Sequence, residues 1–450
     1  MELPDKDLYF PRLQFARFGY QVMGFGAPTS RGFVDPYSGT RLKSQGTGAR
    51  YNCFGGGWVS GTGYDSRIFI KNPFNGTDAT TTGDLEFGKA SVGVASNGTR
   101  IIGSGGYASP SSTSGETVGW TDDGTGPYVV SKIEYYASSS GTDAADFGDV
   151  HFYLVGYPPV GSSNTPSAAE DDTARFYFGS NAVGADGATG FYAGGSGRYT
   201  EGRGYTEEVW KITIDTLSDS EDWGANLDYW KSDLSGIDGY TGTQGSLDIR
   251  WLMMGGKRRD VDVDDAGSAT VQFEEVRYFT YASPSTGTDF GDPHATAQYS
   301  NGNETVKGGQ KKVTGSNGTR GVAMGNSNKV DVDSGETPGA GGDTGGEWVG
   351  IQGNTIEYYT IASTDNAAMF GNMTITYSEG NGQACNGQYL ESWGGYKKND
   401  RPDEGSGGTA HDIVDQISIA STGDAVVNGA HLVSNSSGMD TVQNGGTGSN

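Results

Sequence analysis

The sequence predicts an all-β fold, a β-propeller built from repeated four-stranded antiparallel blades. The first observation is a motif of an Arg or a substitute, four residues and a Gly. It recurs at Arg50–Gly55, Arg100–Gly105, Ala174–Gly179, Arg250–Gly255, Arg320–Gly325 and Tyr389–Gly394. The second is that β-patterned runs such as Lys132–Tyr136 and Thr355–Tyr359 follow most of these openings. Because a repeated all-β unit of about 70 residues cannot bury its own faces, such units must pack into a ring or a stack.

The composition agrees with this fold class. Of 450 residues, 77 are Gly, 25 are Tyr and only 34% are hydrophobic, which is typical of many short strands joined by tight turns. We interpret residues 50–450 as one repeated architecture and residues 1–49 as an extended N-terminal arm. This arm is rich in Pro and aromatic residues, including Pro4, Phe10 and Tyr20, as suits a segment that docks on a partner.

Tight turns give the order of the strands within a repeat. The pentapeptides Ser96–Arg100 and Ser316–Arg320 are identical, and their Asn-Gly pair between alternating runs predicts a β-hairpin. Strand 1 precedes this turn and strand 2 is the Arg-to-Gly segment. Strand 3 is the run of the Ile-Glu-Tyr-Tyr type, and strand 4 follows an aromatic-Gly step such as Phe147-Gly148. Six such sets predict six blades, and seven is the alternative if residues 14–49 complete another.

The two ends of the repeat array predict how the ring closes. The last repeat reaches strand 4 near Ala430–Val433, whereas the first strand 2, Arg50–Gly57, has no complete repeat before it. Pairing of the C-terminal region with the first blade would remove both exposed edges. We therefore expect residues 430–443 to lie beside residues 39–57.

The connections between strands 2 and 3 are long and unlike one another, whereas the 1–2 turns are tight and the 3–4 turns are alike. These long connections are residues 107–130, 180–208, 257–273, 326–353 and 396–412. In an antiparallel meander they all lie on one face of the disc. Variable loops on a rigid scaffold are where binding usually resides, so this face is the predicted contact surface. The alternative is that the loops only pack on one another.

The repeat resembles a known pattern. Diglycines that close strand 2, a following strand with tyrosines and an aromatic such as Trp223 are similar to the kelch repeat of β-propellers. The segment Thr355–Thr364 and the steps Asp146–Asp149 and Asp289–Asp292 resemble the degenerate kelch-like repeats of virion proteins from marine and freshwater tailed phages. The resemblance covers residues 50–432. The repeats are longer than ordinary kelch repeats and two lack the diglycine, which leaves the blade registration open.

Charge and motifs exclude several function classes. A formal net charge of −25 repels phosphate backbones, so we expect no nucleic-acid partner. No stretch of 18 apolar residues and no signal segment occurs, so we expect no membrane insertion. Cys53 and Cys385 are too few for a disulfide framework and are expected to be buried thiols. The four histidines show no metal or catalytic spacing, and we expect a protein that is not an enzyme.

Alternating acidic residues are the one chemically suggestive pattern. Asp260, Asp262 and Asp264 alternate with other residues in one 2–3 connection, and Asp331 and Asp333 do so in another. Oxygen-rich loops suit Ca²⁺, which takes six to eight hard ligands, so calcium is the candidate cofactor. The spacing does not fit the helix-loop-helix calcium motif. The alternative is a solvated acidic strand edge that discourages aggregation.

The resemblance implies a non-enzymatic structural or adhesion protein of a tailed-phage particle, located in the virion as a tail, fibre or decoration component. Its expected partners are other virion proteins, bound through the arm of residues 1–49, a host surface glycan or receptor, and further copies of itself. The alternative function is a propeller that binds or cleaves host surface polysaccharide.

Overall fold

The computed structural model describes part of the chain. The described residues are 51–59, 63–86, 88–90, 92–97, 100–108, 117–119, 128–130, 132–137, 142–150, 182–185, 188–199, 202–232, 235–240, 249–254, 257–259, 270–272, 276–298, 305–307, 313–331, 348–377, 382–398, 408–430, 440–441 and 447–449. Within them every regular element is a β-strand, which confirms the all-β class. The predicted arm, residues 1–49, lies outside the described residues.

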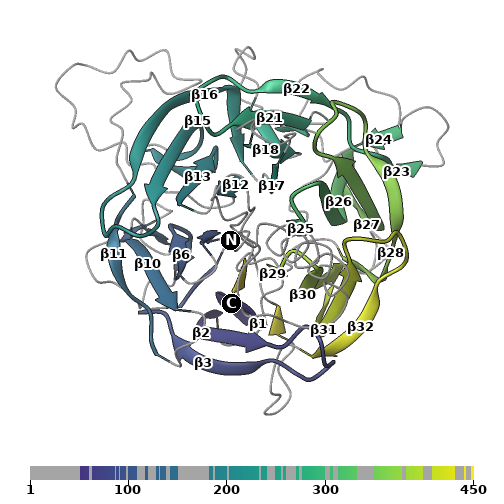
Figure 1. Cartoon of the computed structure of the whole chain (residues 1–450), viewed down its shortest axis with the longest axis horizontal. Coiled ribbons are helices and arrows are strands. Elements are labelled where there is room, and N and C mark those ends of the chain that lie inside the picture. Colours follow the sequence, from purple (N-terminus) through teal and green to yellow (C-terminus); the bar gives the residue numbers. More distant parts are fainter. Residues whose placement is uncertain are drawn as a thin grey trace, which may run out of the picture.

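Five antiparallel units of four strands follow one another along the described chain, and we call them the first to fifth blades (Figure 1). Four of them are complete four-stranded sheets, and the second is the main part of a seven-stranded sheet. The first contains β5 (Gly93–Ser96), β6 (Arg100–Ser104), β10 (Lys132–Ala137) and β11 (Ala145–Asp149). The second contains β12 (Ala182–Ala185), β13 (Thr189–Ala193), β15 (Gly202–Thr213) and β16 (Glu221–Ser232). The third contains β17 (Ser235–Tyr240), β18 (Ile249–Met254), β21 (Val276–Thr280) and β22 (Thr288–Gly291). The fourth contains β25 (Val313–Ser316), β26 (Arg320–Asp331), β27 (Trp348–Thr360) and β28 (Ala368–Tyr377). The fifth contains β29 (Gly382–Cys385), β30 (Tyr389–Lys398), β31 (Gly408–Ser418) and β32 (Val426–Ala430).

A further sheet closes the ring and draws on both ends of the described chain. This closing sheet has β1 (Tyr51–Val59), β2 (Gly63–Lys71) and β3 (Thr80–Asp84), completed by β33 (Asp440–Thr441) and β34 (Thr447–Ser449). Both C-terminal strands pair antiparallel with β1, with Asp440 opposite Val59 and Ser449 opposite Tyr51. The prediction that the C-terminal region pairs with the first strands is confirmed, with shifted bounds: residues 440–441 pair with 58–59 and residues 447–449 pair with 51–53.

The expected number of blades is wrong. Within the described residues, five blades, not six or seven, take all four of their strands from one stretch of the chain. Residues 51–84 supply three strands, and the fourth position is filled by the C-terminal strands. Sequence counting assumed that each strand 2 marks a complete unit, whereas the first one marks a sheet shared between the two ends.

The hydrophobic core of the propeller is divided among the seams between neighbouring sheets. One cluster, with Ile102, Phe147 and Trp210, joins the first and second blades, and another, with Val322 and Leu390, joins the fourth and fifth. Innermost strands also contact one another around the ring, and β34 contacts both β29 and β5. Burial of apolar side chains therefore holds neighbouring sheets together. This explains why 34% hydrophobic residues are enough to form the core of the propeller.

The third repeat opens later than the sequence motif suggested. The expected opening Ala174–Gly179 lies outside the described residues, and strand 2 of the second blade is β13, whose Thr189 pairs with Thr213 of β15. The Arg position of this repeat is occupied by Thr189, and Gly194 ends the strand with φ +64°. A search for Arg could not find this opening, because Thr189 stands where four of the other openings carry Arg.

The hairpin turn between strands 1 and 2 is confirmed, but its geometry differs from the expectation. In the β25–β26 turn, Asn317 N–H donates to the carbonyl oxygen of Arg320, so Gly318 and Thr319 are the two central residues. Gly318 has φ +90°, a region that favours Gly. The Asn317 side chain instead accepts the Arg320 N–H at 2.8 Å. Asn386 makes the same contacts before β30, in a sequence that hides the repeat because Tyr389 replaces Arg.

The long connections between strands 2 and 3 continue partly as β-ribbons. After a bulge beside Gly325, the pairing of β26 and β27 extends to Asp331 opposite Trp348. In the fifth blade the pairing of β30 and β31 extends to Lys398 opposite Gly408. These two extensions are called the fourth-blade and fifth-blade ribbons. Since both follow strand 2, the antiparallel order places them on one face of the ring, as predicted.

Smaller strands decorate the other 2–3 and 4–1 connections. β4 (Lys89–Ala90), β7 (Tyr107–Ala108), β9 (Tyr128–Val130) and β8 (Thr117–Gly119) form a small sheet beside the first blade. β14 (Ser196–Tyr199) pairs with β15, while β19 (Lys257–Arg259) pairs with β16 and β20 (Thr270–Gln272). β23 (Ala295–Gln298) pairs with β24 (Thr305–Lys307).

Candidate functional site: the polar seams

Fully buried carboxylates on strand 3 connect neighbouring sheets. Glu134, Glu357 and Asp415 occupy equivalent positions on β10, β27 and β31, and each is at most 1% exposed. Each accepts a backbone N–H from the outer strand of the preceding sheet or from the residues just after that strand. The donors are Glu86 to Glu134 at 2.6 Å, His294 to Glu357 at 2.9 Å and Thr374 to Asp415 at 3.1 Å. Buried carboxylates that would resemble catalytic groups in isolation thus have a defined role in holding sheets together.

The aromatic-Gly step of strand 4 forms a second contact, at the outer rim. The residue after the Gly donates its N–H to an Asp or Asn of the next 3–4 turn, and its carbonyl accepts an N–H from that turn. The side-chain contacts are Asp84 to Asp143, Asp149 to Asp219, Asp292 to Asn366 and Asn372 to Asp424. We call this pair of hydrogen bonds the rim latch. It explains the Phe-Gly-Asp steps that the sequence repeats.

The arginines of the repeat openings reach across the same seams. The guanidinium of Arg100 lies 4.7 Å from the Tyr135 ring centroid and donates to the carbonyl oxygen of Ile214 in the next blade. Arg320 does the same with Tyr358 and with Ile419. Each arginine therefore stacks on its own blade and binds the following one.

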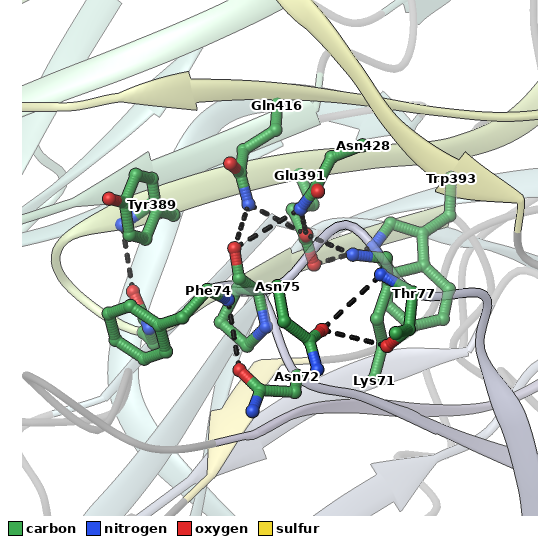
Figure 2. A network of polar contacts seen from close by, with 12 residues as sticks. Lys71, Asn72, Phe74, Asn75, Thr77, Tyr389, Glu391, Trp393, Gln416 and Asn428 are labelled. Atoms are coloured by element: carbon green, nitrogen blue, oxygen red, sulfur yellow. Dashed lines mark hydrogen bonds and ion pairs between the residues drawn. The ribbon is translucent and has the colours of Figure 1, made fainter.

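The seam between the fifth blade and the closing sheet carries a larger polar network (Figure 2). Lys71 Nζ lies 3.2 Å from Glu391 Oε1, and both side chains are 0% exposed. The amide nitrogens of Gln416 and Asn428 donate to the same oxygen at 2.9 and 3.0 Å. Trp393 Nε1 donates to Glu391 Oε2 at 3.2 Å. Donors from the two ends of the propeller chain thus converge on one carboxylate, which we call the closing network.

Burial shifts the protonation of two groups in the polar seams. Desolvation raises the pKa of Tyr359 well above its ordinary value, and the charge of Glu357 and its hydrogen bond with the phenol add to this effect. The phenol therefore stays neutral and donates to Glu357 Oε1 at 2.7 Å. Desolvation also raises the pKa of Asp415 above 3.8, against hydrogen bonds from Thr374 and Ile375 that lower it.

The raised pKa of Asp415 predicts a pH dependence of the free energy of unfolding. A raised pKa in the folded state means that the folded protein binds the proton more tightly, so stability falls as pH rises through the unfolded-state value of 3.8 toward the folded-state value. In Asp415→Asn this part of the fall should disappear. Urea unfolding from acidic to neutral pH measures it, with Asp424→Asn on the exposed rim as control. Parallel pH profiles of Asp415→Asn and the original protein would contradict the assignment.

The predicted calcium ligands are not tested by the structure. Asp260, Asp262, Asp264 and Asp333 lie outside the described residues, and Asp331 is the last residue of β26. Among the described residues no group of three or more His, Cys, Asp or Glu side chains is arranged to hold a metal ion. Calcium binding by these acidic residues stays a prediction. Of the two predicted buried thiols, Cys385 is 2% exposed, and the side chain of Cys53 is not described.

Sequence reasoning missed the turn residues of the rim latch and the closing network. The turn residues did leave a signal, because Asp143, Asp219, Asn366 and Asp424 each precede an Ala or Ser shortly after strand 3. Lys71, Glu391 and Asn428 are not among the residues that define the repeated motifs, and they left no signal.

Comparison with known proteins does not assign the chain to a family. No protein-family model matches the sequence, and no curated protein matches it. In the described residues, no helix has the length and apolar content required to cross a bilayer.

Proposed function

We propose that the protein is a non-enzymatic structural and adhesion component of a tailed-phage virion, a rigid propeller that presents β-ribbons on one face. One observation supports this most: the buried carboxylates of strand 3 are engaged by backbone N–H groups of adjacent sheets, as suits a scaffold. The ribbons of the fourth and fifth blades extend beyond those seams on the face where binding loops were expected. The proposed partners are other virion proteins, through residues 1–49, and a host surface glycan or receptor.

The particle assignment is tested on purified virions. Quantitative mass spectrometry and immunogold labelling with an antibody to this protein should place it on the particle. A low copy number at the tail tip would indicate a fibre role, and a high number would indicate decoration of a capsid or tube. Purified particles from a productive infection that lack the protein would contradict the proposal. Cleavage of host polysaccharide by the purified propeller would instead favour a carbohydrate-active enzyme.

Ribbon shortening tests whether the ribbons are the contact surface. Asn326 lies opposite Gly353, so an Asn-Gly turn can replace residues 327–352 without disturbing the blade. The shortened protein should unfold at the same temperature and lose adsorption to host cells. The matching change in the fifth blade, between Gly395 and His411, serves as the comparison because it removes a different ribbon from the same face. Full adsorption after both changes together would assign binding elsewhere.

A further inference from the structure

The closing network brings an amine and a carboxamide onto one buried carboxylate oxygen (Figure 2). Lys71 Nζ lies 3.2 Å from Glu391 Oε1, and Asn428 Nδ2 donates to that oxygen at 3.0 Å. The two nitrogens therefore cannot be farther apart than the sum of these distances. Trp393 Nε1 holds the second carboxylate oxygen at 3.2 Å and so fixes the plane of the carboxylate.

The surroundings of these groups are largely apolar. Lys71 and Glu391 have fully buried side chains, Asn428 is 7% exposed, and Phe69 and Trp393 belong to the apolar cluster of this seam. A buried ion pair is costly to desolvate, and a proton transfer from the ammonium to the carboxylate would remove both charges from the seam. A neutral amine beside a carboxamide is a nucleophile beside an electrophile.

We propose that Lys71 and Asn428 become joined by an isopeptide bond that forms autocatalytically, with Glu391 as the acid and base. Glu391 takes a proton from Lys71, and the neutral Nζ attacks Cγ of Asn428 to form a new N–C bond. Glu391 then carries a proton from Nζ to Nδ2, and the Cγ–Nδ2 bond breaks. The nitrogen leaves as ammonium, which returns Glu391 to a carboxylate. A lysine ammonium and a carboxamide become a secondary amide and ammonium, with no oxidation or reduction.

Proximity of the reacting groups is what accelerates this reaction. Amide exchange between free side chains is very slow, but alignment of the reacting groups in a rigid site replaces a bimolecular encounter by an internal step. Lys71 ends β2 of the closing sheet and Asn428 lies in β32 of the fifth blade, so folding itself assembles the site. The bond would connect the two sheets whose contact completes the ring.

A second buried ion pair provides a comparison. Lys89 and Glu134 also pair with fully buried side chains, between the small sheet and the first blade. There the other oxygen of the carboxylate accepts the backbone N–H of Glu86, a group that cannot leave as ammonia. Of the two amides on Glu391, we assign Asn428 as the electrophile because its side chain has one torsion fewer than that of Gln416, which holds its carbonyl carbon more firmly.

Intact mass spectrometry of the denatured full-length protein tests the proposal. The mass should be lower than that of the sequence by one ammonia, and tandem spectra of a tryptic digest should contain a branched peptide joining Lys71 to Asn428. Lys71→Arg, Glu391→Gln and Asn428→Ala should each restore the full mass, with circular dichroism confirming that they fold. Asn428→Asp should condense with loss of water and give the same final mass as the original protein. Asn372→Ala, on the neighbouring outer strand, should keep the cross-link.

Three outcomes would overturn the proposal. One is a folded protein with the full sequence mass and an unmodified Lys71. Another is an ammonia loss that persists in Lys71→Arg, because Asn428 precedes Gly429 and could instead cyclise to a succinimide. The third is a branched peptide that joins Lys71 to Gln416, which would show that Asn428 is not the group that Lys71 attacks.

Discussion

Deletion of residues 440–450 is expected to lower the free energy of unfolding by about 3–5 kcal/mol, at roughly 1 kcal/mol for each lost backbone hydrogen bond. These residues contain β33 and β34, which pair with β1 along Trp58–Val59 and Tyr51–Cys53. Their loss leaves β1 as an exposed inner edge and removes the strand that contacts both β29 and β5. Urea unfolding followed by tryptophan fluorescence measures the change.

A peptide control separates ring closure from a general effect of truncation. A synthetic peptide of residues 438–450, added in excess, should restore stability by mass action because it binds only the folded state. Removal of Asn450 alone should have no effect, since β34 ends at Ser449. A truncated protein that unfolds at the same urea concentration as the full chain would show that β33 and β34 do not hold the ring.

Gly371→Ala is expected to destabilise the protein by about 3 kcal/mol, through overpacking and loss of a rim latch. A Cβ atom at Gly371 would lie 2.1 Å from the carbonyl oxygen of Gly423, which belongs to the 3–4 turn of the fifth blade. The backbone cannot retreat without breaking the adjacent bonds, in which Asn372 N–H donates to Asp424 and Gly423 N–H to the Phe370 carbonyl. Thermal and urea unfolding measure the loss.

Gly423→Ala is the matched control for this substitution. A Cβ atom at Gly423 would have no neighbour within 4 Å, although Gly423 lies across the same contact. Its effect should stay within about 0.5 kcal/mol. Equal destabilisation by the two substitutions would mean that glycine acts through backbone freedom and not through close approach, and the rim latch would lose its steric basis.

Local motifs in the sequence predicted much of the fold, because turns and alternating runs are short-range signals. The Asn-Gly turns, the Ile-Glu-Tyr-Tyr strands and the closure of the ring all follow from such signals. The number of blades did not follow from them, for two reasons. The repeat that opens at Thr189 lacks the Arg by which repeats were counted, and the strand that begins at Tyr51 belongs to a sheet shared between distant segments.

The polar seams could not be predicted from residue types alone. Glu134 and Glu357 stand in strands where an acidic residue usually faces solvent, and their partners are backbone N–H groups of Glu86 and His294, which any residue would offer. The closing network has the further difficulty that Lys71 and Glu391 are 320 positions apart. Only the closed ring brings them into contact.

A sheet shared between the two ends of the chain makes completeness a condition for assembly. During synthesis, β1 to β3 are made before the five blades, whereas β33 and β34, which complete their sheet, are made after them. A prematurely terminated chain keeps an open edge on β1, a surface available to chaperones and proteases or to another chain. The order of the strands in the chain therefore makes ring closure depend on translation through β34: only a chain that contains β33 and β34 can present a finished ring.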